Sequence, residues 1–176
     1  MQLWDWLGEP LPVDVANTVR RRGATYRELW RTWADVLAWA GHQAARLPPL
    51  TAGDESRLAE LREVRDDVFA VLRATADHRP YPPEAAARLN ARARAHPVVR
   101  QLGPHPGATR TTPPDDLMAH IVHATIEFAG SPDAERLALC DAPSCGQFFL
   151  RDRTNQQWCG PACGTRARVA RHASRS

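Results

Sequence analysis

Residues 140–163 read CDAPSCGQFFLRDRTNQQWCGPAC, and this stretch holds all four cysteines of the 176-residue chain. The cysteines form two close pairs, Cys140 with Cys145 and Cys159 with Cys163. Zinc suits a tetrahedral set of four thiolates, and each pair can supply two of its corners from one turn. In a reducing compartment, cysteines at this spacing favour a metal site over disulfides. The spacing therefore predicts one structural zinc ion.

The residues around the cysteines predict how the zinc site is built. Segment 146–158 has an aromatic run, a polar turn and a return to Trp158, which favours a β-hairpin. Gly160-Pro161 is typical of a helix start, so a helix with Cys163 in its first turn is predicted over 162–173. We expect one face of this helix to pack on the aromatic residues Phe148, Phe149 and Trp158, through Ala162, Thr165, Val169 and Ala173. The predicted order along the chain is a turn with two zinc ligands, then a hairpin, then a helix that supplies the other two ligands. This is the order of elements in a treble-clef zinc finger.

Charge is as unevenly distributed as cysteine. All 23 basic residues are arginine. Residues 1–135 carry 16 arginines and 18 acids, a net charge of −2, whereas residues 136–176 carry 7 arginines and 2 acids, a net charge of +5. Zinc held by four thiolates would lower the charge of this tail to about +3. A basic end on a near-neutral body fits a polyanionic partner such as DNA, but a solvated terminal helix would also be rich in arginine, so charge alone leaves both interpretations open. The candidate contacts are Arg151, Arg153, Arg166, Arg168, Arg171, His172 and Arg175.

The first 135 residues show mainly helical periodicity. Thr25 and Glu28 have the spacing of a capping box, and apolar residues follow at three- and four-residue steps to Ala40, which predicts a helix. Other helices are expected around 13–19 (ending near Gly23), from Asp54, from Pro82 to about His96, and from Pro113 to Gly130. Within 97–112, β-branched runs flank a Gly-Pro-His-Pro-Gly turn, which predicts a β-hairpin.

Two features of the body fit either a ligand site or ordinary packing. Five tryptophans fall within the first 39 residues, and Trp30 and Trp33 are candidates for a pocket or for the core. The last helix of the body carries a polar stripe of Asp116, His120, His123 and Glu127. Two histidines with two carboxylates can bind a metal, but the outer face of an amphipathic helix is polar in any case.

Several classes of protein lack support in this sequence. It has no Gly-x-Ser-x-Gly, no phosphate-binding or dinucleotide-binding glycine motif, and no His-Glu-x-x-His, so we expect no enzyme. No stretch of 18 apolar residues is present, and the first residues show no basic and apolar leader. The expectation is a cytoplasmic protein without a membrane partner.

The tail resembles the CGNR zinc-finger family. The residues that carry the resemblance are Cys140, Cys145, Phe148, Phe149, Arg153, Asn155, Trp158, Cys159, Cys163, Gly164, Thr165, Arg166, Arg168, Arg171 and His172. The body resembles the ABATE domain that precedes this finger, whose L-D-x-x-N-T start is matched by Asp14, Asn17 and Thr18. The tail departs from the family pattern at Thr165 (asparagine in the family), at Gln156-Gln157 (commonly basic) and at Gly160 (usually serine).

The resemblance implies a bacterial transcription regulator that responds to stress. In such proteins the body is thought to bind an unidentified effector and the finger to bind DNA. By matched position, the four cysteines would hold zinc and the stretch 166–171 would face DNA. Asp14, Asn17 and Thr18 would be a structural or pocket signature.

These observations together predict an α+β, mainly α fold. We expect an ABATE-like helical, ligand-binding domain with a small β-hairpin over residues 1–135 and a treble-clef zinc finger over residues 136–176. The predicted function is DNA-binding transcription regulation, with one zinc ion and an unknown small-molecule effector. Two alternatives stay open, a zinc-stabilised interaction or assembly module and a thiolate redox sensor, neither of which binds DNA. The oligomeric state is not fixed, and a homodimer is compatible with the sequence.

Overall fold

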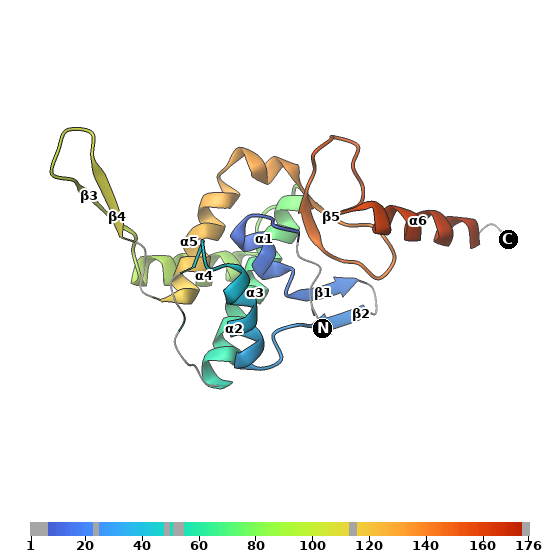
Figure 1. Ribbon diagram of the computed structural model, residues 1–176, viewed down its shortest axis with the longest axis horizontal. Helices are drawn as coiled ribbons and strands as arrows, with labels where there is room; N and C mark the ends of the chain where they lie inside the picture. The colour runs from blue at the N-terminus through green and yellow to red at the C-terminus, as the bar shows by residue number, and fades with distance from the viewer. Residues whose placement is uncertain (1–6, 23–24, 48–49, 51–54, 113–115, 174–176) are drawn as a thin grey trace.

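Helices make up just over half of the described residues, and three short antiparallel hairpins lie between them (Figure 1), which confirms the α+β, mainly α class. The computed structural model describes residues 7–22, 25–47, 50, 55–112 and 116–173. The elements are α1 (Leu11–Ala16), β1 (Val19–Arg22), β2 (Thr25–Glu28), α2 (Trp33–His42), α3 (Glu55–Ala76), α4 (Pro83–Ala95), β3 (Val99–Leu102), β4 (Thr109–Thr112), α5 (Leu117–Ala129), the 3-10 helix η1 (Pro132–Arg136), β5 (Leu137–Leu139), β6 (Phe148–Leu150) and α6 (Pro161–Ala173). Of these described helices, none combines the length and the apolar composition that spanning a bilayer requires.

The body is built around α1, all six residues of which are buried against α3 and α5. The tryptophans pack into the same core. Trp30 is fully buried and meets Trp39 edge to face, with their ring centroids 4.9 Å apart, and Trp33 is 9% exposed. Trp30 and Trp33 are therefore core residues, which agrees with the second of the two interpretations, packing in the core rather than lining a pocket.

The beginning of the body corrects two predictions. The helix expected around 13–19 ends at Ala16, and β1 follows it. The capping box of Thr25 and Glu28 is wrong, because these residues form β2 and pair with β1. The helix begins only at Trp33, where Thr32 accepts a hydrogen bond from the backbone N–H of Asp35 and the Asp35 carboxylate accepts one from the N–H of Thr32. Pairing with the adjacent strand β1 has overridden the helix signal.

The remaining body elements agree with the sequence. Helix α4 and the β3–β4 hairpin lie where they were predicted, and α5 ends before Gly130 as expected. The predicted starts at Asp54 and Pro113 lie outside the described residues. The β3–β4 hairpin and α6 project at opposite ends of the longest axis of the molecule (Figure 1).

The tail has a hairpin, but not the expected one. Strand β6 pairs with β5, so the first cysteine pair lies in the loop between the two strands. The return strand predicted to reach Trp158 is wrong, because the ladder partner of β6 precedes it in the chain. At the end of this loop Gly146 has φ of 69°, in the left-handed region that glycine adopts without strain.

Strand β6 joins the tail to the body. Successive side chains of a strand point to opposite faces. Phe148 enters the core of the body, where its ring centroid lies 5.0 Å from that of Phe69, and Phe149 packs among the cysteines. Hydrophobic packing is thus continuous across the expected division at residue 135, and that division stays a prediction.

Candidate zinc centre and nucleic-acid interface

The tertiary structure brings the four cysteines together. Their sulfur atoms all lie within 4.8 Å of one another. The Sγ of Cys159 lies 3.7 Å from that of Cys145 and 3.5 Å from that of Cys163. All four are free thiols, and these separations far exceed the disulfide bond length of about 2.05 Å.

This arrangement fits zinc. A tetrahedral ion with zinc–sulfur bonds of about 2.3 Å places its sulfur atoms about 3.8 Å apart, close to the separations seen here. The close packing of the sulfur atoms also disfavours several thiolates in the absence of a cation. Hydrogen bonds from the thiols of Cys145 and Cys159 lower the pKa of Cys140, and the same contacts raise the pKa of Cys145 and of Cys159. A divalent ion would compensate four thiolates in this small space.

Neighbouring side chains support the cysteines. The guanidinium of Arg166 donates a hydrogen bond to the Sγ of Cys163 at 2.9 Å, and this contact raises the pKa of Arg166. Gln156 fastens the loop before the second cysteine pair: its Oε1 accepts from the N–H of Asp152, and its Nε2 donates to the carbonyl of Trp158. This glutamine therefore has a structural role.

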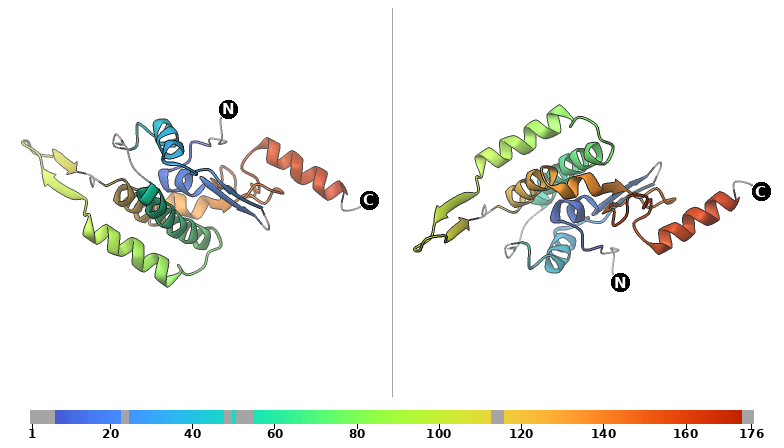
Figure 2. Two further views of the ribbon diagram at one scale, coloured as in Figure 1. Left: turned by 90° about the horizontal axis from the view of Figure 1, so that it is seen from below. Right: turned by 90° about the horizontal axis from the view of Figure 1, so that it is seen from above.

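Helix α6 presents a different face to the zinc site from the one predicted. Its buried residues are Cys163, Gly164 and Ala167, whereas Ala162, Thr165, Val169 and Ala173 are exposed, Val169 by 63%. Cys163 must face the other sulfurs, so it fixes the rotation of the helix. After Ala167 every described residue of α6 is exposed, and the helix extends away from the body (Figure 2).

The candidate DNA contacts differ in their surroundings. Arg168, Arg171 and His172 are exposed on the projecting part of α6, and Arg171 also stacks over Trp158 with 5.8 Å between the guanidinium carbon and the ring centroid. Arg166 is instead bonded to the zinc site. In the preceding loop Arg153 is exposed and Arg151 is half-buried, and Arg175 lies outside the described residues.

The three residues of the body that carry the family resemblance, Asp14, Asn17 and Thr18, are buried and hydrogen-bond other parts of the protein. Asn17 exchanges two hydrogen bonds with the backbone of Phe148, and the hydroxyl of Thr18 donates to the carbonyl of Val15. The carboxylate of Asp14 accepts from Gln43 at 3.1 Å and from Arg46 at 2.9 Å. Burial raises the pKa of Asp14 in spite of both donors.

The polar stripe on α5 does not converge on one point. Asp116 is the N-cap of α5 and pairs with Arg57 at 3.1 Å. The Nε2 atoms of the two histidines donate to carbonyls on other segments, His120 to Arg46 and His123 to His96. Glu127 is exposed. Within the described residues, the cysteine group is the one cluster of three or more side chains able to hold a metal ion.

A cleft of about 530 Å³ lies between the body and the tail. Residues 7–10 and Arg46 line it from the body, and Arg136, Asp152 and the zinc-site residue Cys159 line it from the tail. Burial raises the pKa of Glu9 in this cleft, and nearby carboxylates add to the effect. Sequence reasoning missed these residues, since no local pattern places Arg46 and Cys159 in one cleft.

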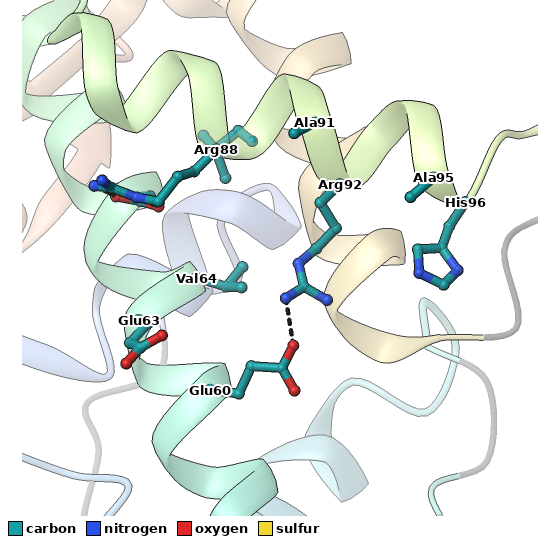
Figure 3. A pocket seen from close by; sticks show the side chains of 10 residues that line it. Glu60, Glu63, Val64, Arg88, Ala91, Arg92, Ala95 and His96 are labelled. Carbon is teal, nitrogen blue, oxygen red and sulfur yellow. Dashed lines mark hydrogen bonds and ion pairs between the residues drawn. The ribbon is translucent and has the colours of Figure 1, made fainter.

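A second hollow, of about 460 Å³, lies between α3 and α4 (Figure 3). Arg92 of α4 points to Glu60 of α3 and pairs with it, and Arg88 pairs with Asp67 at 2.6 Å. These arginines are already neutralised within the protein. The residues expected to form a ligand pocket, Asp14, Asn17, Thr18, Trp30, Trp33, His120 and His123, line neither this hollow nor the cleft.

Fold and site together define a zinc-finger protein with a helical body, and comparison with known families agrees. The sequence profile of the ABATE family, described as "Putative stress-induced transcription regulator", matches residues 9–132, and that of the CGNR zinc finger matches residues 136–176. The chain belongs to the ABATE family and carries a CGNR zinc finger, whose four cysteines form a structural site for one zinc ion. Neither family is described as an enzyme. Comparison with curated proteins gives no match.

Proposed function

We propose that this protein is a DNA-binding transcription regulator whose helix α6 contacts DNA and whose body senses a small molecule. One observation carries the DNA-binding part: α6 is held at its first turns by the zinc site and then extends from the molecule with Arg168, Arg171 and His172 exposed. An α-helix fits the major groove, and arginine pairs with phosphates and with guanine edges. The proposal places the protein in the cytoplasm, where bacterial DNA lies.

The cleft between body and tail supports the sensing part. It is lined at once by the body, through Arg46, and by the tail, through Arg136 and Cys159. A ligand bound there would contact both parts and would favour one arrangement of the tail over others by its differential affinity. This is a more direct route to the zinc finger than the hollow between α3 and α4, which lies within the body.

The test is fluorescence anisotropy of the zinc-loaded protein with a duplex from the region upstream of its own gene and with a scrambled duplex, over a salt series. Each neutralised phosphate contributes about −0.9 to the slope of log affinity against log salt. The variant Arg168→Gln/Arg171→Gln should therefore lose up to about 2 in slope. Arg100→Gln/Arg110→Gln is the matched control, because it removes the same charge from the β3–β4 hairpin at the other end of the molecule.

Tighter binding to the upstream duplex that is lost in Cys159→Ser, weakened by the α6 pair and unchanged by the β3–β4 pair would support the proposal. Equal losses in both arginine pairs would mean that net charge alone attracts DNA. A wild-type protein without DNA affinity that forms a zinc-dependent oligomer in light scattering would favour the assembly module instead.

A further inference from the structure

We infer that the β1–β2 hairpin is a second DNA-contacting element, which binds the phosphate backbone beside α6. The inference rests on the proposed DNA-binding function and extends it to the body, for which only ligand binding was expected. Two-stranded β-ribbons are used by several DNA-binding proteins, and contacts to phosphates fix the orientation of a protein on the duplex.

The hairpin concentrates positive charge. Residues 19–28 read VRRRGATYRE, so four of the 16 arginines of the body lie in ten positions. The segment has one acid, Glu28, which turns to α3 and pairs with Arg65 at 2.6 Å. Arg20 is buried at the base of the hairpin, and Arg27 on the second strand is exposed. The net charge of residues 1–135, which is −2, does not reveal this run of arginines.

The location of the hairpin separates it from other basic segments. Figures 1 and 2 show β1–β2 at the end of the molecule from which α6 extends. The β3–β4 hairpin is also basic, with Arg100 and Arg110 and no acid within residues 97–112, but it projects at the opposite end. A duplex held along α6 therefore has β1–β2 as its basic neighbour, while β3–β4 is remote from it.

The pairing of the strands indicates which arginines to change. Arg20 lies opposite Arg27, and Arg22 lies opposite Thr25. Arg27 is exposed on β2, and Arg22 is the last residue of β1, next to the turn, so these two arginines are changed. Arg20 is left unchanged because it is buried and its loss would disturb the fold.

The experiment compares Arg22→Gln/Arg27→Gln with Arg100→Gln/Arg110→Gln in the zinc-loaded, full-length protein. Both variants remove two positive charges from a two-stranded hairpin, so they have the same net charge. The probe is the upstream duplex, and the readout is the slope of log affinity against log salt. We expect the slope to fall by about 2 in the β1–β2 variant, at about 0.9 for each phosphate contact, and to stay unchanged in the control. The single variant Arg27→Gln, at an exposed position, should lose about half as much.

Zinc content and melting temperature, measured on the same samples, establish that the variants are folded. If the double variant is unfolded, the single variant decides. Equal slopes in the wild type and both hairpin variants would overturn the inference. The proposed function would still stand in that case, because the wild-type protein would bind the duplex. Equal losses in the two hairpin variants would overturn it as well, since they would show an effect of net charge. A wild-type protein that binds no DNA would overturn both proposals.

Discussion

Asn17 and Phe148 lie 131 residues apart in the chain and exchange two hydrogen bonds. The Nδ2 of Asn17 donates to the carbonyl of Phe148 at 2.9 Å, and the Oδ1 of Asn17 accepts from the N–H of Phe148 at 2.8 Å. The amide thus occupies the place of a neighbouring strand's peptide group on the free side of β6. Because both residues are buried, no water can replace these bonds, and the zinc finger is fixed to the body.

Asn17→Ala should destabilise the whole protein. It would leave a buried N–H and a buried carbonyl without partners, at a cost of about 1–3 kcal/mol each. Denaturant unfolding should show a lower midpoint, whereas Asn90→Ala, at an exposed position on α4, should change the free energy of unfolding by less than about 0.5 kcal/mol. Equal midpoints for the two variants would contradict the importance of this contact.

Removal of zinc should destabilise the body as well as the tail. The four thiolates lose the cation that lets them share a small space, and the strand that places Phe148 in the core of the body borders this site. A chelator should lower the melting temperature of the whole chain, as followed by circular dichroism, and added Zn²⁺ should restore it. The idea fails if zinc leaves, by metal analysis, and the melting temperature stays the same.

Arg166 should support zinc binding. Its hydrogen bond to the Sγ of Cys163 stabilises the thiolate, and the loss of such a supporting contact typically weakens metal binding about 10- to 100-fold. Competition with a chromophoric chelator should show this loss in Arg166→Ala. Arg168→Ala, which removes an arginine bonded to Thr165 and not to a cysteine, is the control and should leave zinc affinity unchanged.

Gly164 should tolerate little bulk. A Cβ atom there would lie 3.4 Å from Cε3 of Trp158, so the larger side chain of Gly164→Val would push this ring away from the zinc site. We expect a loss of about 1–3 kcal/mol in the free energy of unfolding. A Cβ at Gly160 would meet no atom within 4 Å, so Gly160→Val is the comparison. Similar unfolding curves for the two variants would show that Trp158 has room to move.

Glu9→Gln should change how stability depends on pH. Burial raises the pKa of Glu9 above its ordinary value of 4.5, so in the folded protein the protonated form is favoured relative to the unfolded chain. The contribution of Glu9 to stability is therefore lost as pH rises from below 4.5 through its folded pKa, and the glutamine of the variant makes no such contribution. The difference in unfolding free energy between variant and wild type should shift in favour of the variant over this range and then level off.

Glu135→Gln, at an exposed position in η1, controls for the loss of one negative charge. Taking the difference between each variant and the wild type removes the pH dependence of the zinc site, which all three proteins share. A Glu9→Gln difference that stays constant with pH would contradict the raised pKa.

Some of the structure could be predicted because its causes are local. The proline at the start of α4 and the turn residues of the β3–β4 hairpin act within a few positions, and both elements lie where they were expected. The spacing of the cysteines is equally local, and it indicated the zinc site. The helix signal at Thr25 and Glu28 was local too, but there the ladder with β1 prevailed.

By itself, the sequence determined the fold class, the zinc ligands and the helix that carries Cys163, since each depends on residues close together in the chain. Only the tertiary structure decided which strand pairs with β6, which face of α6 turns inward and what Asn17 does. These features depend on partners brought together by folding. Asn17 hydrogen-bonds the backbone of a strand residue that lies 131 positions away. Cys163 sets the rotation of its helix because its sulfur atom must lie close to the other three.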